Sequence, residues 1–332
     1  MTGAILTARG VVQDFAAHGG LWRRGRVRAV DGIDLDVREG ETLAIVGESG
    51  SGKSSLARLL LALARPSAGV IAYRGTPITA LSRAQRRTYR RDVQAVFQDP
   101  AASLNPRMRV EQILSYVLLE HELATRATVR GVMEAQLEAV GLSPSASFLT
   151  RYPHQLSGGQ QQRIAIARAL ALRPRLIIAD EPLSSLDISV QTQLLDLMAE
   201  LQSRNGIGFV MISHDLGAVE SIADRVAVMY RGRIVEAGAD ILARPRHPYT
   251  KTLLDAKLIP DPRRARARII EDEAAPPSEA APESGAGCSF LSRCQQAQEV
   301  CATTPPALRA DSAGEGVACH LVPSDEFRER KP

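Results

Sequence analysis

This sequence has few aromatic residues, no long apolar run and a small net charge. Phe, Trp and Tyr make up 4% of the 332 residues, and the formal net charge is only +4. The longest apolar run, Leu59 to Ala64, is far shorter than the roughly 20 residues that a membrane-spanning helix needs. No basic head precedes an apolar block at the N-terminus, so no secretory signal is predicted. We therefore expect a cytoplasmic protein for which the composition demands no nucleic acid partner.

Cysteine is absent until late in the chain, where four occur at Cys288, Cys294, Cys301 and Cys319. In a cytosolic protein, such clustering favours a metal site over disulfides. The spacings are wider than the CxxC pairs of common zinc fingers, so they do not identify a metal. Four thiolates suit tetrahedral zinc or an iron–sulphur cluster, and reduced structural thiols are a third alternative.

A glycine-rich run between an apolar strand and a helix is the most informative feature present. The strand is predicted over 42–46 and the helix over 55–64. The run consists of Gly47, Glu48, Ser49, Gly50, Ser51, Gly52, Lys53 and Ser54, with Ser55 next to it. Its pattern fits the phosphate-binding loop of nucleotide hydrolases, in which backbone N–H groups and a helix N-terminus hold phosphate oxygens. We expect Lys53 to reach the β- and γ-phosphates and Ser54 to hold Mg²⁺.

Three further apolar strands, predicted over 93–97, 176–179 and 208–213, each end in polar residues. Gln98 follows the first, and it would orient the attacking water or contact Mg²⁺. Asp180 and Glu181 follow the second, where Asp180 would bind Mg²⁺ through its water shell and Glu181 would accept a proton from water. His214 follows the third and is placed to bind a γ-phosphate oxygen. Taken singly, each of these residues also fits an ordinary loop or surface position.

The start of a second helix, which is predicted over 161–172, is formed by Leu156, Ser157, Gly158, Gly159 and Gln160. It offers exposed N–H groups and a hydroxyl, which predicts a second anion site. One triphosphate does not need two such helix starts. We therefore expect Ser157 and Gly159 to complete a site on another subunit.

Flanking segments predict the remaining architecture. Alternating residues over 2–40 predict a small antiparallel sheet. On it, Phe15 is placed to stack on adenine, although a core position is an equal alternative and Trp22 competes for the role. Helical periodicity over 110–142 predicts an inserted helical subdomain. The segment from Arg83 to Arg91 is interpreted as arginine-rich turns on a solvated face, and residues 226–236 as a hairpin that closes the core.

Together, and in this order, these motifs resemble those of ATP-binding cassette (ABC) proteins over residues 4–255, and Leu-Ser-Gly-Gly-Gln is the most specific. The finer match is to ATPase subunits of bacterial oligopeptide and dipeptide importers. It is carried by residues 96–106, by Arg-Tyr-Pro-His at 151–154 and by His-Pro-Tyr-Thr at 247–250. The resemblance implies a P-loop α/β fold with a RecA-like core, an antiparallel β lobe, a helical subdomain over about 98–172 and a small cysteine-bearing lobe. It also places Gln160 and Asp187 in the ATP site.

The resemblance further implies a set of partners. Two ATPase subunits, usually paralogues, would close head to tail around two ATP molecules at the cytoplasmic face of the membrane. Two permease subunits and an extracytoplasmic substrate-binding protein would complete the importer, and a permease helix would dock near Gln98. Di- and oligopeptides are the expected cargo. A metal chelate is an alternative cargo, and a soluble cassette ATPase of translation or DNA repair is an alternative function.

The chain beyond the cassette is predicted to form two parts. Residues 256–286, rich in Pro, Arg and Ala, are interpreted as a linker after the 1–255 nucleotide-binding domain. In it, Arg263, Arg264, Arg266 and Arg268 form a basic cluster that is most simply solvated. Residues 287–332 are predicted to form the C-terminal lobe. The resemblance extends to this segment, because some peptide importers carry a four-iron cluster at four similar cysteines; Gln295 replaces their usual proline.

Overall fold

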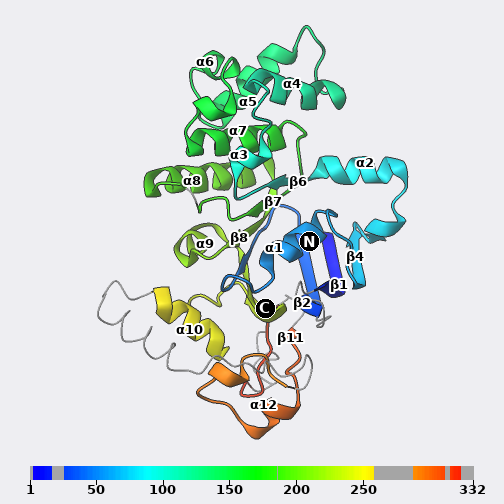
Figure 1. Ribbon diagram of the computed structural model, residues 1–332, viewed down its shortest axis with the longest axis vertical. Helices are drawn as coiled ribbons and strands as arrows, with labels where there is room; N and C mark the ends of the chain where they lie inside the picture. Colours follow the sequence, from blue (N-terminus) through cyan, green and yellow to red (C-terminus); the bar gives the residue numbers. More distant parts are fainter. Residues whose placement is uncertain (1–2, 17–25, 185, 258–286, 311–314, 323–332) are drawn as a thin grey trace, which may run out of the picture.

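The computed structural model describes residues 3–16, 26–184, 186–257, 287–310 and 315–322. Trp22, Ser185, the basic cluster and nearly all of the predicted linker lie outside these ranges. An elongated molecule results, with helices α4, α5 and α6 at one end and the C-terminal segment with α12 at the other (Figure 1).

A mixed sheet of eight strands forms the centre of the molecule, with the order β11-β12-β10-β9-β3-β8-β7-β6. Its bounds are β3 Thr42–Val46, β6 Val93–Val96, β7 Leu176–Asp180, β8 Gly208–Ser213, β9 Arg225–Tyr230, β10 Arg233–Gly238, β11 Arg309–Ala310 and β12 Gly316–Val317. Strands β6, β7, β8, β3 and β9 run parallel to one another. All five residues of β3 are buried, as expected for a parallel strand covered on both faces. The parallel strands therefore end at one edge, where their polar residues gather.

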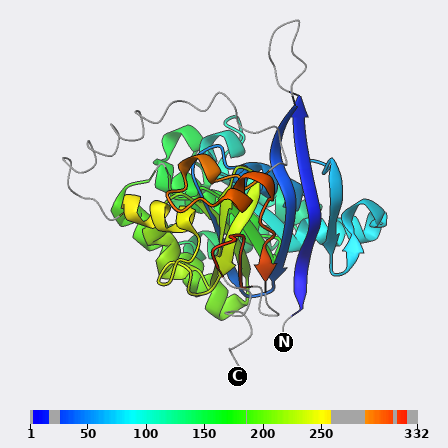
Figure 2. The ribbon, with the colours of Figure 1, turned by 90° about the horizontal axis from the view of Figure 1, so that it is seen from below.

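The N-terminal strands form a second, antiparallel sheet, as the alternation over 2–40 predicts. It has the order β2-β1-β4-β5, with β1 Ala4–Ala16, β2 Arg26–Arg38, β4 Ala68–Tyr73 and β5 Thr76–Pro77. Seen from below, β1 and β2 stand beside the central sheet (Figure 2). Their apolar residues pack with α1 and with one face of the central sheet in a common core.

Helices cover the central sheet and build the predicted helical subdomain. Their bounds are α1 Lys53–Leu60, α2 Arg83–Asp92, α3 Pro100–Ser103, α4 Val110–Glu120, α5 Val129–Ala139, α6 Ala146–Leu149, α7 Gly158–Leu170, α8 Ile188–Asn205, α9 Leu216–Ile222, α10 Pro248–Lys257 and α12 Glu299–Thr303. Short 3₁₀ helices are η1 Ile78–Ala80, η2 Pro153–Gln155 and η3 Leu291–Arg293. One core cluster joins α4, α5 and α7 to the β6, β7 and β8 side of the sheet. The helical subdomain thus shares its core with the sheet.

One sequence prediction of local structure is wrong. The arginine-rich segment forms the helix α2 rather than turns, because Ser82 and Gln85 make a reciprocal capping box at its start. The C-terminal segment adds to the central sheet, because β12 pairs with β10. Phe290 of this segment is 2% exposed in a cluster with residues of β3, β9 and α10.

Candidate nucleotide site and the cysteine segment

The phosphate loop connects the end of β3 to the first residue of α1. Two of its glycines are required sterically, because a Cβ at Gly47 would lie 2.1 Å from the Met229 carbonyl oxygen and one at Gly52 would lie 2.0 Å from that of Ala29. Both have positive φ, 152° at Gly47 and 104° at Gly52, which favours glycine. The Ser51 hydroxyl is buried without a hydrogen-bond partner among the described residues. A glycine-lined cradle with an unsatisfied donor fits a phosphate group.

Lys53 and Ser54 are the first two residues of α1, directly after the phosphate loop. Lys53 Nζ donates to the carbonyl oxygens of Gly47 and Glu48, both at 2.8 Å. Burial lowers the pKa of Lys53, against the opposing influence of Glu181, Asp180 and Glu48. A buried ammonium group at the start of a helix provides positive potential for an anion.

Asp180 lies at the end of β7, beside the phosphate loop. Its Oδ1 accepts a hydrogen bond of 3.0 Å from the Ser54 hydroxyl, so the structure brings the two predicted Mg²⁺ ligands together. Burial raises the pKa of Asp180, and the Ser54 hydrogen bond opposes that shift. A hydroxyl and a carboxylate are oxygen donors of the kind Mg²⁺ takes in nucleotide sites, so the residues fit this ion.

Glu181 and His214 also meet at this edge of the sheet. The distance from His214 Nδ1 to Glu181 Oε1 is 3.5 Å, with 62% of the histidine side chain exposed and 21% of the glutamate. Glu181 has a backbone φ of 47°, and its N–H donates to the Ile212 carbonyl at 3.0 Å. Non-glycine residues seldom adopt this conformation, and they often do so at functional sites. The neighbouring Asp215 caps α9 instead of facing the site.

No described contact assigns the roles of Gln98 and Phe15. Gln98 is exposed and follows β6, which pairs in parallel with β7. It therefore leaves the sheet at the same edge as Asp180. Phe15 is 42% exposed and pairs with Val27 on β2. Water positioning by Gln98 and adenine stacking by Phe15 stay predictions.

The second helix start lies away from the phosphate loop, as α7 and α1 are well separated in Figure 1. The Ser157 hydroxyl caps α7 by accepting from the N–H of Gln160 at 3.3 Å, and Gln160 Oε1 accepts from the N–H of Ser157. A Cβ at Gly159 would lie 2.7 Å from Val190 Cγ1. This contact places Gly159 against α8, whose N-cap is Asp187. Residues 156–160 and Asp187 thus border one surface.

The four cysteines converge although they are far apart in sequence. All four line one small cavity with His247 and His320, and the other three thiols contribute to the raised pKa of Cys288, after burial, the main cause. Within the described ranges, however, no group of three or more His, Cys, Asp or Glu side chains is arranged to hold a metal ion. The four thiols suit a metal by their chemistry, and the iron–sulphur or zinc site stays a prediction.

Sequence reasoning did not connect the cysteine segment with the phosphate loop. Arg293 Nη1 lies 2.9 Å from Glu48 Oε2, and the Glu48 N–H donates to Tyr249 Oη at 3.0 Å. The only sequence signal was the His-Pro-Tyr-Thr motif at 247–250, which contains Tyr249.

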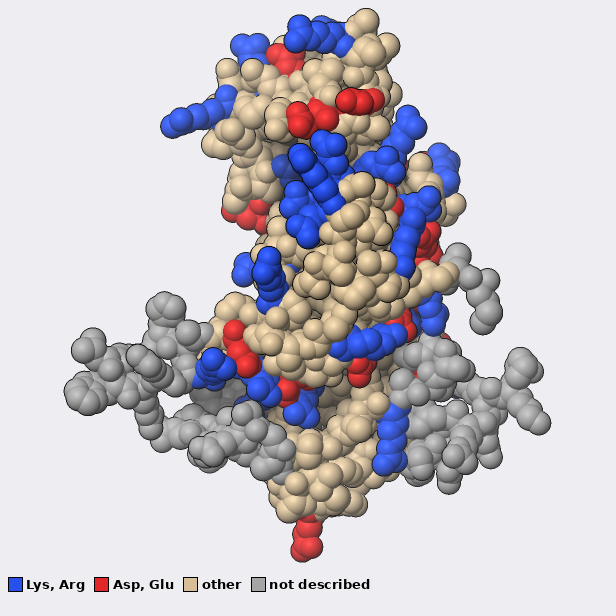
Figure 3. Space-filling model, turned by 90° about the vertical axis from the view of Figure 1, so that its right-hand side faces the viewer, with Lys and Arg blue, Asp and Glu red and all other residues tan. Residues whose placement is uncertain are grey.

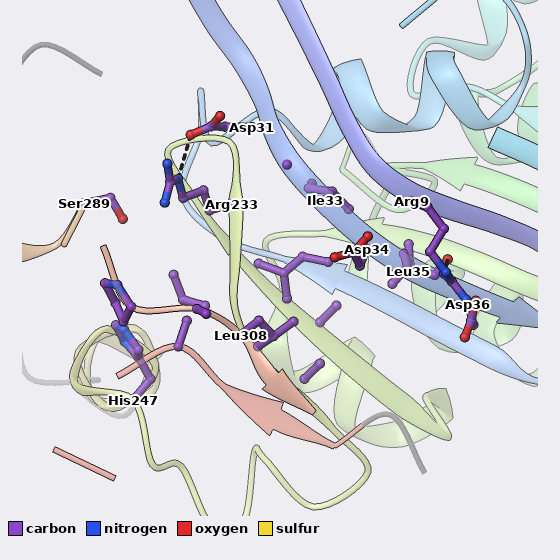
Figure 4. A pocket seen from close by; sticks show the side chains of 18 of the residues that line it. Arg9, Asp31, Ile33, Asp34, Leu35, Asp36, Arg233, His247, Ser289 and Leu308 are labelled. Carbon is purple, nitrogen blue, oxygen red and sulfur yellow. Dashed lines mark hydrogen bonds and ion pairs between the residues drawn. The ribbon is translucent and has the colours of Figure 1, made fainter. Parts of the chain in front are cut away.

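A separate cavity of about 570 Å³ lies between β2, β10 and the C-terminal segment (Figure 4). Arg233 and Asp31 at its border form an ion pair of 2.6 Å. None of the predicted ATP-site residues lines this cavity. It is therefore distinct from the nucleotide site.

Comparisons with known proteins agree with this geometry. The model of the ABC transporter family matches residues 30–184, and that of the oligopeptide/dipeptide transporter C-terminal region matches residues 235–301. The chain is 44% identical over 326 residues to "Probable peptide ABC transporter ATP-binding protein y4tS" of Sinorhizobium fredii, covering 97% of this chain and 91% of that protein. It is 43% identical over 324 residues to "Oligopeptide transport ATP-binding protein AppF" of Bacillus subtilis, covering 96% and 97%.

A solved structure supports the fold. The dimeric post-hydrolysis state of the ATP-binding cassette MJ0796, bound to ADP and Pi, superposes with a TM-score of 0.63 at 26% identity. The match covers 70% of this chain and 98% of that one.

Proposed function

This chain belongs to the ABC transporter family of ATPases, and we propose that it is the ATP-hydrolysing subunit of a peptide importer. The observation that carries the peptide assignment is the likeness to peptide transport proteins over nearly the whole chain. It includes the C-terminal region, which matches the oligopeptide/dipeptide transporter model. The same region favours an importer over a soluble cassette ATPase.

We propose that hydrolysis uses the residues gathered at the edge of the central sheet. Lys53 would bind the β- and γ-phosphates, while Ser54 and Asp180 would hold Mg²⁺, which neutralises phosphate charge when bound. Glu181 would accept a proton from the attacking water. His214, within 3.5 Å of Glu181, would donate a hydrogen bond to the γ-phosphate. The meeting of these side chains at the start of α1 and at the ends of β7 and β8 supports this assignment.

A second ATPase subunit would complete the site. The proposed contact surface includes Ser157, Gly159 and Asp187, and Ile188 beside them is 82% exposed. An exposed isoleucine next to a helix start that packs closely at Gly159 is consistent with burial against a partner. The related cassette MJ0796 is dimeric. We propose a paralogue as the partner, as in the family that the sequence resembles.

The permease subunits would dock on a groove between α1, β4, α2 and β6. Its volume is about 680 Å³, and Leu63 and Val70 on its lining are 64% and 48% exposed. Lys and Arg side chains gather on the side of the molecule shown in Figure 3, and five exposed arginines belong to α2. Phe97, next to Gln98, also lines the groove. An apolar floor beside these arginines suits a cytoplasmic permease helix.

Among the described residues, no helix is long and apolar enough to cross a membrane. We therefore propose attachment to the cytoplasmic face of the membrane through the permeases, with an extracytoplasmic protein delivering the peptide. Co-purification with the products of neighbouring genes tests this. Recovery of permeases and a peptide-binding protein is expected, whereas recovery of ribosomal or DNA-repair factors would refute it.

The metal prediction for the four cysteines has its own test. Their shared cavity supports a common ligand, and four thiolates suit an iron–sulphur cluster. Protein purified without oxygen is expected to be brown and to contain iron. A colourless protein with one zinc per chain would favour zinc over the iron–sulphur cluster. A protein free of both metals would show that the four cysteines are reduced structural thiols.

A further inference from the structure

The C-terminal segment contacts the phosphate loop directly. Arg293 and Glu48, 245 positions apart, form an ion pair of 2.9 Å, with 33% and 43% of their side chains exposed. The Glu48 carboxylate is the largest influence that raises the pKa of Arg293. Glu48 is the second residue of the loop whose carbonyl oxygens hold Lys53.

Arg293 is fixed in place by its own segment. It ends the turn η3, its N–H donates to the Phe290 carbonyl at 3.1 Å, and its guanidinium carbon lies 5.7 Å from the Phe290 ring centroid. Phe290 in turn lies 5.3 Å from Tyr230 and 5.5 Å from Tyr249, measured between ring centroids. The guanidinium is thus placed by buried aromatic packing, which reduces the entropy cost of the ion pair.

Tyr249 makes the second contact. Its ring is fully buried, and its Oη accepts the 3.0 Å hydrogen bond from the backbone N–H of Glu48. Burial raises the pKa of Tyr249 to about 12, so the hydroxyl stays protonated at neutral pH. Backbone and side chain of Glu48 are therefore held by two residues outside the loop.

We propose that Arg293 and Tyr249 are positioning residues for ATP, through which the cysteine-bearing segment sets nucleotide affinity. The proposal rests on the proposed ATPase function. Arg293 and Tyr249 fix Glu48, and Glu48 supplies one of the two carbonyl oxygens that place Lys53. Asp180 ends β7 and Glu181 follows it, so both are positioned by a different element from the one that holds Lys53. Loss of Arg293 should consequently weaken ATP binding more than the chemical step.

The test uses the importer complex with Arg293→Gln, Glu48→Gln and the double variant. We expect Arg293→Gln to raise KM for ATP about two- to fivefold, the range of one partly exposed ion pair, with kcat near wild type. Arg293→Lys should restore part of the loss. In the Glu48→Gln background, Arg293→Gln should add nothing, since its partner charge is gone. Arg130→Gln, which removes an exposed ion pair with Glu134, should leave KM unchanged.

Tyr249→Phe provides an independent variant, because it leaves the Glu48 N–H without its acceptor and should also raise KM. Unchanged KM in Arg293→Gln, or additive effects of Arg293→Gln and Glu48→Gln, would overturn the proposal. Binding of a fluorescent ATP analogue is measured in the same variants, which separates nucleotide affinity from ATP hydrolysis. A complex that binds nucleotide with the predicted shifts but never hydrolyses ATP would contradict the proposed function and leave this inference standing.

Discussion

His214 Nδ1 lies 3.5 Å from Glu181 Oε1, so residues that follow two different strands, β8 and β7, meet at one point. Parallel neighbours β7 and β8 are in register from Leu176 with Gly208 to Asp180 with Ile212. The parallel pairing therefore sets the distance between Glu181, the proposed base, and His214, the proposed hydrogen-bond donor to the γ-phosphate.

Replacement of the proposed base tests the chemistry. Glu181→Gln keeps the size of the side chain but removes the proton acceptor, so kcat should fall by about 10²–10⁴-fold. ATP should still bind, and an ATP-bound dimer should accumulate during gel filtration. Glu200→Gln, at an exposed ion pair with Arg204 on α8, is the control and should turn over normally. Near-normal turnover in Glu181→Gln would refute the assignment of the base.

Gly159 packs against Val190. A larger residue at position 159 should therefore disturb residues 156–160, and a smaller residue at position 190 should reverse the effect. A Cβ at Gly159 meets only Val190 atoms within 4 Å among its nearest neighbours, so Gly159→Ala should shift the helix start. Hydrolysis should fall by about 10- to 100-fold, as for a misplacement near 1 Å, while nucleotide binding by the isolated chain stays intact. Adding Val190→Ala should restore activity. Lack of rescue by the double variant would show that the loss has another cause.

Leu63 tests the permease groove. At 64% exposure, Leu63→Asp should change the free energy of unfolding by no more than about 0.5 kcal/mol. It should nevertheless place a charge on the apolar floor and reduce co-purification with the permeases. Val300→Asp, at an exposed site in the C-terminal segment, is the matched control. Equal recovery of permeases with both variants would place the docking surface elsewhere.

Tyr73 tests the packing of β4 against the end of α2. Its hydroxyl donates to Asp92, 3% exposed, at 2.7 Å, so Tyr73→Phe should lower the free energy of unfolding by about 1–3 kcal/mol. Burial, followed by Asp92, raises the pKa of Tyr73 from 10.0 to about 12. The neutral form is therefore favoured in the folded state, and this stabilisation is lost as pH rises from 10 to 12.

Chemical denaturation at several pH values measures this effect. The difference between wild type and Tyr73→Phe should narrow above pH 10. Tyr116→Phe, at a 63% exposed position, should match wild type throughout. A constant difference across the alkaline range would contradict the role of the hydroxyl.

The residues of the candidate nucleotide site can be picked out from the sequence because the patterns that contain them are local. The phosphate loop, the strand before Asp180 and Glu181, and the strand before His214 are each contiguous patterns. A parallel sheet brings their ends to one edge, as predicted. The helix α2 was missed because it is polar except at Ala84 and its buried Tyr89, although Ser82 and Gln85 carried the capping signal.

The C-terminal contacts could not be predicted in the same way. The strands β11 and β12 have two residues each, too few to show periodicity. The contacts of Arg293 with Glu48, and of Phe290 with Tyr230, join distant positions through packing alone. No local propensity marks such pairs, so the link between the cysteine segment and the loop becomes visible only in three dimensions.

Peptide uptake by the reconstituted complex tests the central claim most directly. The complex of this chain with its partner ATPase, permeases and binding protein is placed in vesicles, with ATP on the side of the ATPases. The account predicts that peptide accumulates only with ATP, and that Glu181→Gln stops both uptake and hydrolysis. Hydrolysis by the lone chain at the same rate, indifferent to partner, permease and peptide, would contradict it.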